Sequence, residues 1–184
     1  MNVMLLHGWG GSDFPHWQSW LAGEIAKEYG CVDFFRFPNV DAPVLDVWKE
    51  AAIQELRRFR PDVLVCHSLA NTLWFHLCNE GLVEEKLKEL FLVAPPSLEC
   101  SIEELQTFFP VSAPEDLHAK RVHLIVSDND PYMQKEEAKQ LAQVLDVEPI
   151  FLKNAGHINA QSGFGPWPWM LQQVLKKDRD ARND

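Results

Sequence analysis

The chain has 184 residues, of which 46% are apolar and 24% charged, and its formal net charge at pH 7 is −10. This length suits one well-buried core and is short for two, so we expect a single domain over residues 1–184. The negative charge argues against a nucleic-acid partner and against binding to anionic membrane surfaces, because both need a basic face.

The first predicted strand is the short apolar run from Met1 to Leu6. It has no basic region before it and ends after a few residues, so we expect neither a signal peptide nor a membrane span. The four cysteines form no CxxC pair and have no metal-ligand spacing with histidine, which indicates reduced and mostly buried thiols. Together these features predict a cytoplasmic protein.

Helices and strands are predicted to alternate along the rest of the chain. A first helix ends at Gly30, with Ser12 or Asp13 as its candidate N-cap. Its apolar positions, at helical spacing, are Phe14, Trp17, Leu21 and Ile25. Further strands are predicted over residues 31–37, 63–66, 90–94, 121–126 and 149–152, and further helices over about 45–59, 69–81, 132–145 and 166–176. Short apolar strands that alternate with helices predict an α/β fold, a parallel sheet covered on both faces.

A pentapeptide with a central serine stands where the third predicted strand gives way to a helix. It reads Cys66-His67-Ser68-Leu69-Ala70 and follows the apolar run Val63-Leu64-Val65. In an α/β-hydrolase the nucleophilic serine occupies a sharp strand-to-helix turn, usually spelled G-x-S-x-G because its flanks are crowded. Cys66 and Ala70 replace these glycines, and both are small enough for such a turn.

Three other segments supply the companions that a nucleophilic serine needs. The first strand breaks at His7-Gly8-Trp9-Gly10-Gly11-Ser12, a loop able to offer a backbone N–H to an oxyanion. The fifth strand is followed by Ser127-Asp128-Asn129-Asp130-Pro131, and the sixth by Asn154-Ala155-Gly156-His157. The order oxyanion loop, serine, aspartate, histidine is that of the α/β-hydrolases.

These positions suggest roles in acyl transfer. Ser68 is the candidate nucleophile and His157 the candidate general base, held by Asp130 or by its rival Asp128. The backbone N–H groups of Trp9 and Leu69 are the candidate oxyanion hole.

Cys66, His7 and His67 are expected to have structural and not catalytic roles. Cys66, as the last strand residue, is expected to point its sulfur into the packed sheet and stay protonated. His7 and His67 are expected to bond the backbone. This chemistry needs no metal. Residues 95–118 are too long for an ordinary connection, and form either a small cap over the site or a surface excursion. Residues 177–184 read as a charged, fraying tail.

The chain resembles the small serine hydrolases related to retinoblastoma-binding protein nine, which include many short bacterial members. The resemblance covers nearly the whole chain, through the oxyanion loop, Ser68 and the aspartate loop. Its longest part is Gly156-His157-Ile158-Asn159-Ala160-Gln161-Ser162-Gly163-Phe164-Gly165-Pro166-Trp167-Pro168. It implies a minimal six-stranded α/β-hydrolase fold in three layers, a Ser-Asp-His triad and no cofactor. Because the acid of this family immediately precedes a proline, the resemblance favours Asp130.

Two classes of function follow. The first is a serine hydrolase that cleaves small carboxylic esters or related acyl compounds through an acyl-enzyme, with a small-molecule acyl substrate as its partner. The alternative is a non-catalytic protein-binding module on a hydrolase scaffold, for which the altered elbow is the one supporting feature. The pocket-protein motif Leu-x-Cys-x-Glu is absent, since Leu98-Glu99-Cys100-Ser101-Ile102 ends differently. The complete set of triad residues favours the hydrolase.

Overall fold

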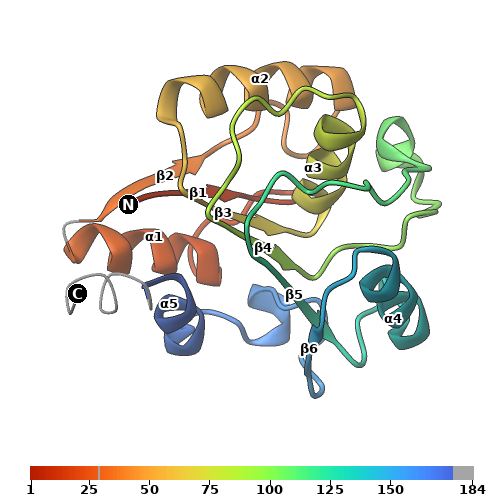
Figure 1. Ribbon diagram of the computed structural model, residues 1–184. Coiled ribbons are helices and arrows are strands. Elements are labelled where there is room, and N and C mark those ends of the chain that lie inside the picture. Colours follow the sequence, from red (N-terminus) through yellow and green to blue (C-terminus); the bar gives the residue numbers. More distant parts are fainter. Residues whose placement is uncertain (29, 176–184) are drawn as a thin grey trace.

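Strands and helices alternate through the described chain, residues 1–28 and 30–175 of a computed structural model (Figure 1). The strands are β1 (Asn2–Leu6), β2 (Cys31–Phe35), β3 (Val63–His67), β4 (Glu89–Val93), β5 (Val122–Ser127) and β6 (Pro149–Leu152). The helices are α1 (Trp17–Lys27), α2 (Leu45–Phe59), α3 (Leu69–Asn79), α4 (Lys135–Val144) and α5 (Pro168–Leu175), with short 3-10 turns η1 (Glu103–Phe108) and η2 (Ala160–Ser162). Lys176 and the predicted charged tail, 177–184, lie outside the described residues.

The described strands form one parallel sheet of six, in the order β2-β1-β3-β4-β5-β6. Helices α1 and α5 cover one face, and α2, α3 and α4 cover the other (Figure 1). Alternate strand residues feed the two cores: Met4 and Leu6 of β1 pack toward α2 and α3, whereas Val3 and Leu5 pack toward α1. The predicted three-layer α/β fold is therefore confirmed.

The first helix begins later than its apolar spacing predicted. Phe14, taken as a buried helical position, is 88% exposed, and α1 starts at Trp17. A residue that precedes proline avoids the helical conformation, and Phe14 precedes Pro15. The N-cap is His16 instead of Ser12 or Asp13, since its Nδ1 accepts a hydrogen bond from the Gln18 N–H at 3.1 Å.

Several other boundaries differ for local reasons. Strand β2 ends at Phe35 instead of residue 37, because Phe37 leaves the sheet and stacks on Trp48 with ring centroids 4.3 Å apart. Helix α4 begins at Lys135 instead of residue 132. Its start is set by a capping box, in which the Gln134 N–H donates to the Glu137 carboxylate. The expectation of mostly buried cysteines was wrong for Cys31, which is exposed on β2, one of the two edge strands of the sheet. Cys66 and Cys78 are buried and Cys100 is half-buried.

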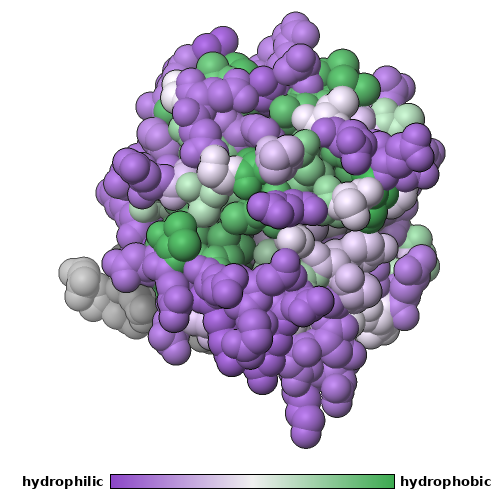
Figure 2. Space-filling model, turned by 90° about the vertical axis from the view of Figure 1, so that its right-hand side faces the viewer, coloured by the Kyte–Doolittle hydropathy of each residue, from purple (hydrophilic) through white to green (hydrophobic). Residues whose placement is uncertain are grey.

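The long segment 95–118 contains η1 and otherwise has little regular structure. Leu105, Phe108 and Val111 anchor it in the core that α2 and α3 share. The segment lies on the right of Figure 1, on the side that Figure 2 turns toward the viewer. That side exposes hydrophobic residues near its middle and hydrophilic residues below (Figure 2). The role of the segment as a cap stays a prediction.

Candidate active site

Ser68 occupies a strained turn between β3 and α3. Its φ of 55° and ψ of −124° lie in a region that non-glycine residues rarely adopt, as a nucleophile elbow requires. Its N–H donates to the Val93 carbonyl at 3.0 Å. The Asn71 side chain, one turn into the helix, donates from Nδ2 to the carbonyls of Ser68 (2.8 Å) and Val93 (2.9 Å). Sequence reasoning missed Asn71, which ties the elbow to the end of β4.

The two substituted elbow positions are fully buried. Cys66 and Ala70 each have 0% exposure and pack in the core on the α3 face of the sheet. Burial raises the pKa of the Cys66 thiol well above its usual range, so the sulfur stays protonated. The structural interpretation of Cys66 is confirmed.

Gly8 presses against Ser68 from the neighbouring strand end. A β-carbon at Gly8 would lie 2.6 Å from Ser68 Cβ and 3.1 Å from Ser68 Oγ. Real β-carbons do not approach other atoms so closely, so only glycine fits here without movement. Gly8 thus allows the loop after β1 to contact Ser68 directly.

The three predicted triad side chains come together in one hydrogen-bonded chain. Ser68 Oγ lies 2.7 Å from His157 Nε2, and His157 Nδ1 lies 2.9 Å and 3.0 Å from the two oxygens of Asp130. Because a carboxylate only accepts, Nδ1 carries the proton and donates it to Asp130, which leaves Nε2 as the acceptor for the Ser68 hydroxyl. The side chains of His157 and Asp130 are 8% and 3% exposed.

Four consecutive residues, Ser127 at the end of β5 and the three that follow it, hold the loop after β6. Asp128 accepts from the Asn154 N–H at 2.7 Å, and Ser127 Oγ accepts from the Ala155 N–H at 3.1 Å. Asn129 Oδ1 accepts from the Gly156 N–H at 2.8 Å, and Asp130 binds His157. The Asp128 carboxylate therefore binds the backbone N–H of Asn154, whereas the Asp130 carboxylate binds the imidazole of His157.

Two further side chains fix the backbone of His157. Ser162 Oγ accepts from its N–H, and His67 Nε2 lies within hydrogen-bond distance of its carbonyl, each at 3.1 Å. Because a carbonyl only accepts, His67 donates, as expected of a residue that bonds backbone. Burial lowers the pKa of His67 well below its usual value, so the ring is neutral. Sequence reasoning missed Asn129 and Ser162, whose short polar side chains are common in any loop.

His7 orients the Gly8–Trp9 peptide unit in the loop after β1. Its Nε2 accepts from the Phe37 N–H at 2.9 Å, so Nδ1 carries the proton and donates to the Gly8 carbonyl at 2.7 Å. In a trans peptide the N–H points opposite to the carbonyl, so this bond also sets the direction of the Trp9 N–H. In the described chain, neither the Trp9 N–H nor the Leu69 N–H donates a hydrogen bond to another residue.

These groups open into a cleft of about 380 Å³. Ser68, His157, Trp9 and Leu69 all line it. One wall is mainly apolar and comes from residues 96–105, including Ile102 and Leu105. The lining also holds Tyr132, whose ring lies 4.5 Å from that of His157 in an edge-to-face contact. The volume suits a small organic molecule.

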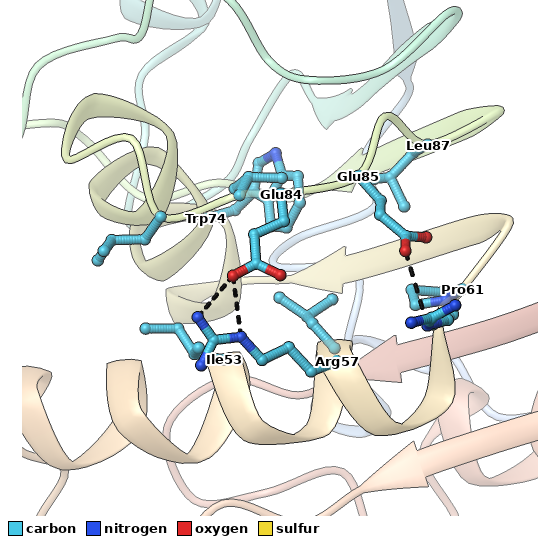
Figure 3. A pocket seen from close by; sticks show the side chains of 11 residues that line it. Ile53, Arg57, Pro61, Trp74, Glu84, Glu85 and Leu87 are labelled. Carbon is cyan, nitrogen blue, oxygen red and sulfur yellow. Dashed lines mark hydrogen bonds and ion pairs between the residues drawn. The ribbon is translucent and has the colours of Figure 1, made fainter.

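A smaller cavity lies elsewhere, between α2 and the chain that leads into β4. It measures about 70 Å³ and is lined mainly by apolar side chains, Trp74 and Leu87 among them. The Arg57–Glu84 and Arg60–Glu85 ion pairs border it (Figure 3). Among the described residues, none lines both this cavity and the cleft at Ser68.

Residues 1–28 and 30–175 contain neither a candidate metal site nor a candidate membrane-spanning helix. No group of three or more histidine, cysteine, aspartate or glutamate side chains there could hold a metal ion. No helix in the same residues combines the length and apolar character needed to cross a bilayer.

Known proteins similar to this chain share its length and fold. The sequence profile of the serine hydrolase family matches residues 3–176. YdeN of Bacillus subtilis (strain 168) is 24% identical over 173 residues, which cover 91% of this chain and 90% of YdeN.

Solved structures give the same result. The crystal structure of the Bacillus subtilis YdeN product has a TM-score of 0.81 at 23% identity, covering 95% of this chain and 97% of that one. A YdeN-like protein of Pectobacterium atrosepticum has a TM-score of 0.70 at 29% identity, with 95% and 89% covered. Monoacylglycerol lipase of Paleococcus ferrophilus has a TM-score of 0.63 at 13% identity, with 84% and 85% covered. These likenesses show the α/β-hydrolase fold.

Proposed function

The chain belongs to the serine hydrolase family, and we propose that it cleaves small carboxylic esters or related acyl compounds through Ser68, His157 and Asp130. The observation that carries this proposal is the hydrogen-bonded chain from Asp130 through His157 to Ser68, which ends in the cleft. Structural likeness to a monoacylglycerol lipase supports the choice of ester bonds.

In the first half of the reaction Ser68 Oγ attacks the acyl carbon and its proton passes to His157 Nε2, 2.7 Å away. The bond from the acyl carbon to the leaving oxygen then breaks, and that oxygen takes the proton from His157. An acyl-enzyme on Ser68 and a free alcohol result. In the second half a water molecule gives its proton to His157 and attacks the same carbon, which releases the acid and restores the Ser68 hydroxyl.

The remaining groups stabilise charge. Asp130 keeps the Nδ1 proton on His157 and stabilises the imidazolium that forms in each half-reaction. The N–H groups of Trp9 and Leu69 receive the negative charge on the acyl oxygen, and each such donor contributes about 3 kcal/mol to the transition state in comparable sites. Leu69 is the first residue of α3, so the positive end of the helix dipole adds to this effect.

A fluorophosphonate probe and an aryl ester test the proposal together. We expect the probe to label Ser68 alone, and Ser68→Ala to lose both the label and about a millionfold in turnover of 4-nitrophenyl butyrate. Ser101→Ala is the matched control, since Ser101 is exposed and does not line the cleft. Labelling that survives Ser68→Ala would refute the assignment. A folded wild-type protein that neither labels nor hydrolyses a panel of short- and long-chain esters would favour the binding-module alternative.

A further inference from the structure

The lining of the cleft includes two buried polar side chains with no role in the proposed chemistry. Ser12 and His16, both from the loop between β1 and α1, line the same cleft as Ser68. They are 2% and 5% exposed. A polar side chain removed from water at the edge of a cleft needs a hydrogen-bond partner.

His16 presents a fixed N–H donor. Its Nδ1 accepts the Gln18 N–H at the start of α1, so the ring proton resides on Nε2. Nε2 is buried and has no hydrogen-bond partner in residues 1–28 and 30–175. Burial lowers the pKa of His16 to about 4, and the nearby His157 makes a second, smaller contribution in the same direction. The ring is thus neutral at pH 7, and Nε2–H is a neutral donor.

Ser12 repeats this pattern with a hydroxyl. Its Oγ is buried and likewise has no hydrogen-bond partner in the described part of the chain. A buried polar group left unpaired costs free energy, so these two side chains destabilise the free protein. A bound molecule that pairs with them removes this cost, and an alkyl group at the same place does not.

We propose that Ser12 and His16 form a polar subsite beside Ser68, which binds an uncharged oxygen acceptor of the substrate such as an ether, hydroxyl or carbonyl oxygen. This rests on the proposed function, because it assigns the substrate class of the same cleft. The hydrocarbon part of the substrate lies against Ile102 and Leu105, which line the same cleft.

The charge of the cleft selects against an anionic group. No lysine or arginine is among the described residues that line it, so a carboxylate or phosphate would lose its hydration without a countercharge. Asp13, also in the lining, adds negative charge, although Arg36 pairs with it at 2.7 Å. An uncharged oxygen atom needs no countercharge and is not repelled by Asp13.

Binding to the Ser68→Ala protein tests the subsite without turnover. Two matched pairs of stable amides differ by one oxygen in place of a methylene: 3-methoxypropananilide with pentananilide, and N-(2-methoxyethyl)benzamide with N-butylbenzamide. The first pair puts the oxygen in the acyl part and the second in the leaving group. Dissociation constants are measured by calorimetry. We expect the ether member of at least one pair to bind about tenfold more tightly, the worth of about one hydrogen bond.

Two substitutions in the Ser68→Ala background link this preference to the subsite. His16→Asn removes Nε2–H but keeps a side-chain acceptor able to cap α1, and Ser12→Ala removes the hydroxyl. Each is expected to reduce the ether preference, whereas Ser101→Ala keeps it. If His16→Asn fails to fold, Ser12→Ala still decides the matter.

Equal affinities within both pairs, no measurable binding of any of the four amides, or a preference that survives both substitutions would overturn the subsite. Failure of the proposed function is recognised separately, by the absence of labelling and ester hydrolysis in the wild-type protein. The subsite and the reaction can therefore fail independently.

Discussion

Gly8 and Ser68 pack so closely that a β-carbon on Gly8 would lie 2.6 Å from Ser68 Cβ. The contact joins the loop after β1 to the turn after β3, two neighbouring strands of the sheet. The distance from the Trp9 N–H, one of the two proposed oxyanion donors, to Ser68 therefore depends on the absence of a side chain at Gly8. Because attack by Ser68 tolerates little displacement of its hydroxyl, a substitution at Gly8 tests directly whether this packing matters for the reaction.

We expect Gly8→Ala to lower kcat/KM by about a hundredfold, the effect of a shift of roughly 1 Å at a reacting atom. The added methyl must displace Ser68 or the loop, while the sheet below stays intact. Ester hydrolysis and thermal unfolding would be measured side by side. Gly23→Ala is the control, because Gly23 is an exposed helix residue whose added β-carbon would meet nothing within 4 Å. Unchanged turnover in a folded Gly8→Ala protein would contradict the expectation.

The two aspartates of the loop after β5 should differ sharply in their effect on rate. Asp130→Asn replaces a carboxylate, which only accepts, with an amide whose NH2 group can face His157 Nδ1 and favour the wrong tautomer, and in other triads such a change lowers kcat by about ten-thousandfold. Asp128→Asn keeps an oxygen that can accept from the Asn154 N–H, so its effect on kcat should be far smaller. Steady-state kinetics on both variants checks this, and the reverse ranking would move the role to Asp128.

Ala70 tests how tight the elbow is. It is fully buried where α3 packs on the sheet, so Ala70→Leu should cost about 1–3 kcal/mol of unfolding free energy through overpacking. It should also displace Ser68, which stands two residues before it, and lower turnover further than the stability loss explains. Urea unfolding together with kcat/KM measures both effects, with Ala70→Gly as the small-residue comparison. Normal stability and turnover in Ala70→Leu would show that the elbow has room to spare.

Protein stability should fall as the pH drops from 6.5 toward 4, in part because of His16. Burial lowers its pKa from 6.5 to about 4 in the folded protein, so in this window the unfolded chain binds a proton that the folded chain does not. This linkage reduces the unfolding free energy by up to about 1.4 kcal/mol per pH unit.

His16→Asn removes this proton linkage. The unfolding free energy of the variant, measured with urea at several pH values, should therefore depend less steeply on pH between 6.5 and 4. The buried His7 and His67, whose pKa values are also lowered, keep part of the dependence in both proteins. Equal slopes for the two proteins would contradict a neutral, buried His16.

The order of the elements could be predicted from the sequence because their signals are local. Short apolar runs lie between segments whose apolar residues recur at helical spacing, and this pattern predicted six strands that alternate with helices. Strand β6 (Pro149–Leu152) was predicted with its observed bounds. The candidate site also came from local pattern, since Ser68, the loop that holds Asp128 and Asp130, and His157 each follow a strand, and the carboxyl ends of parallel strands meet at one edge of a sheet. The choice of Asp130 over Asp128 came from the family resemblance. Predicted helix and strand boundaries were wrong where a single contact sets the boundary. The start of α1 is an example, because the His16 ring caps the helix through Nδ1.

The tertiary structure alone decided the relations between residues far apart in the chain. No local pattern could say that Asp128 binds the Asn154 backbone while Asp130 binds His157, because the choice depends on how two loops meet across β5 and β6. The same holds for the contact of Gly8 with Ser68 and for the burial of Ser12 and His16 in the lining of the cleft. Sequence periodicity records which residues avoid water, whereas distances between side chains are set only when the packed sheet brings its strand ends together.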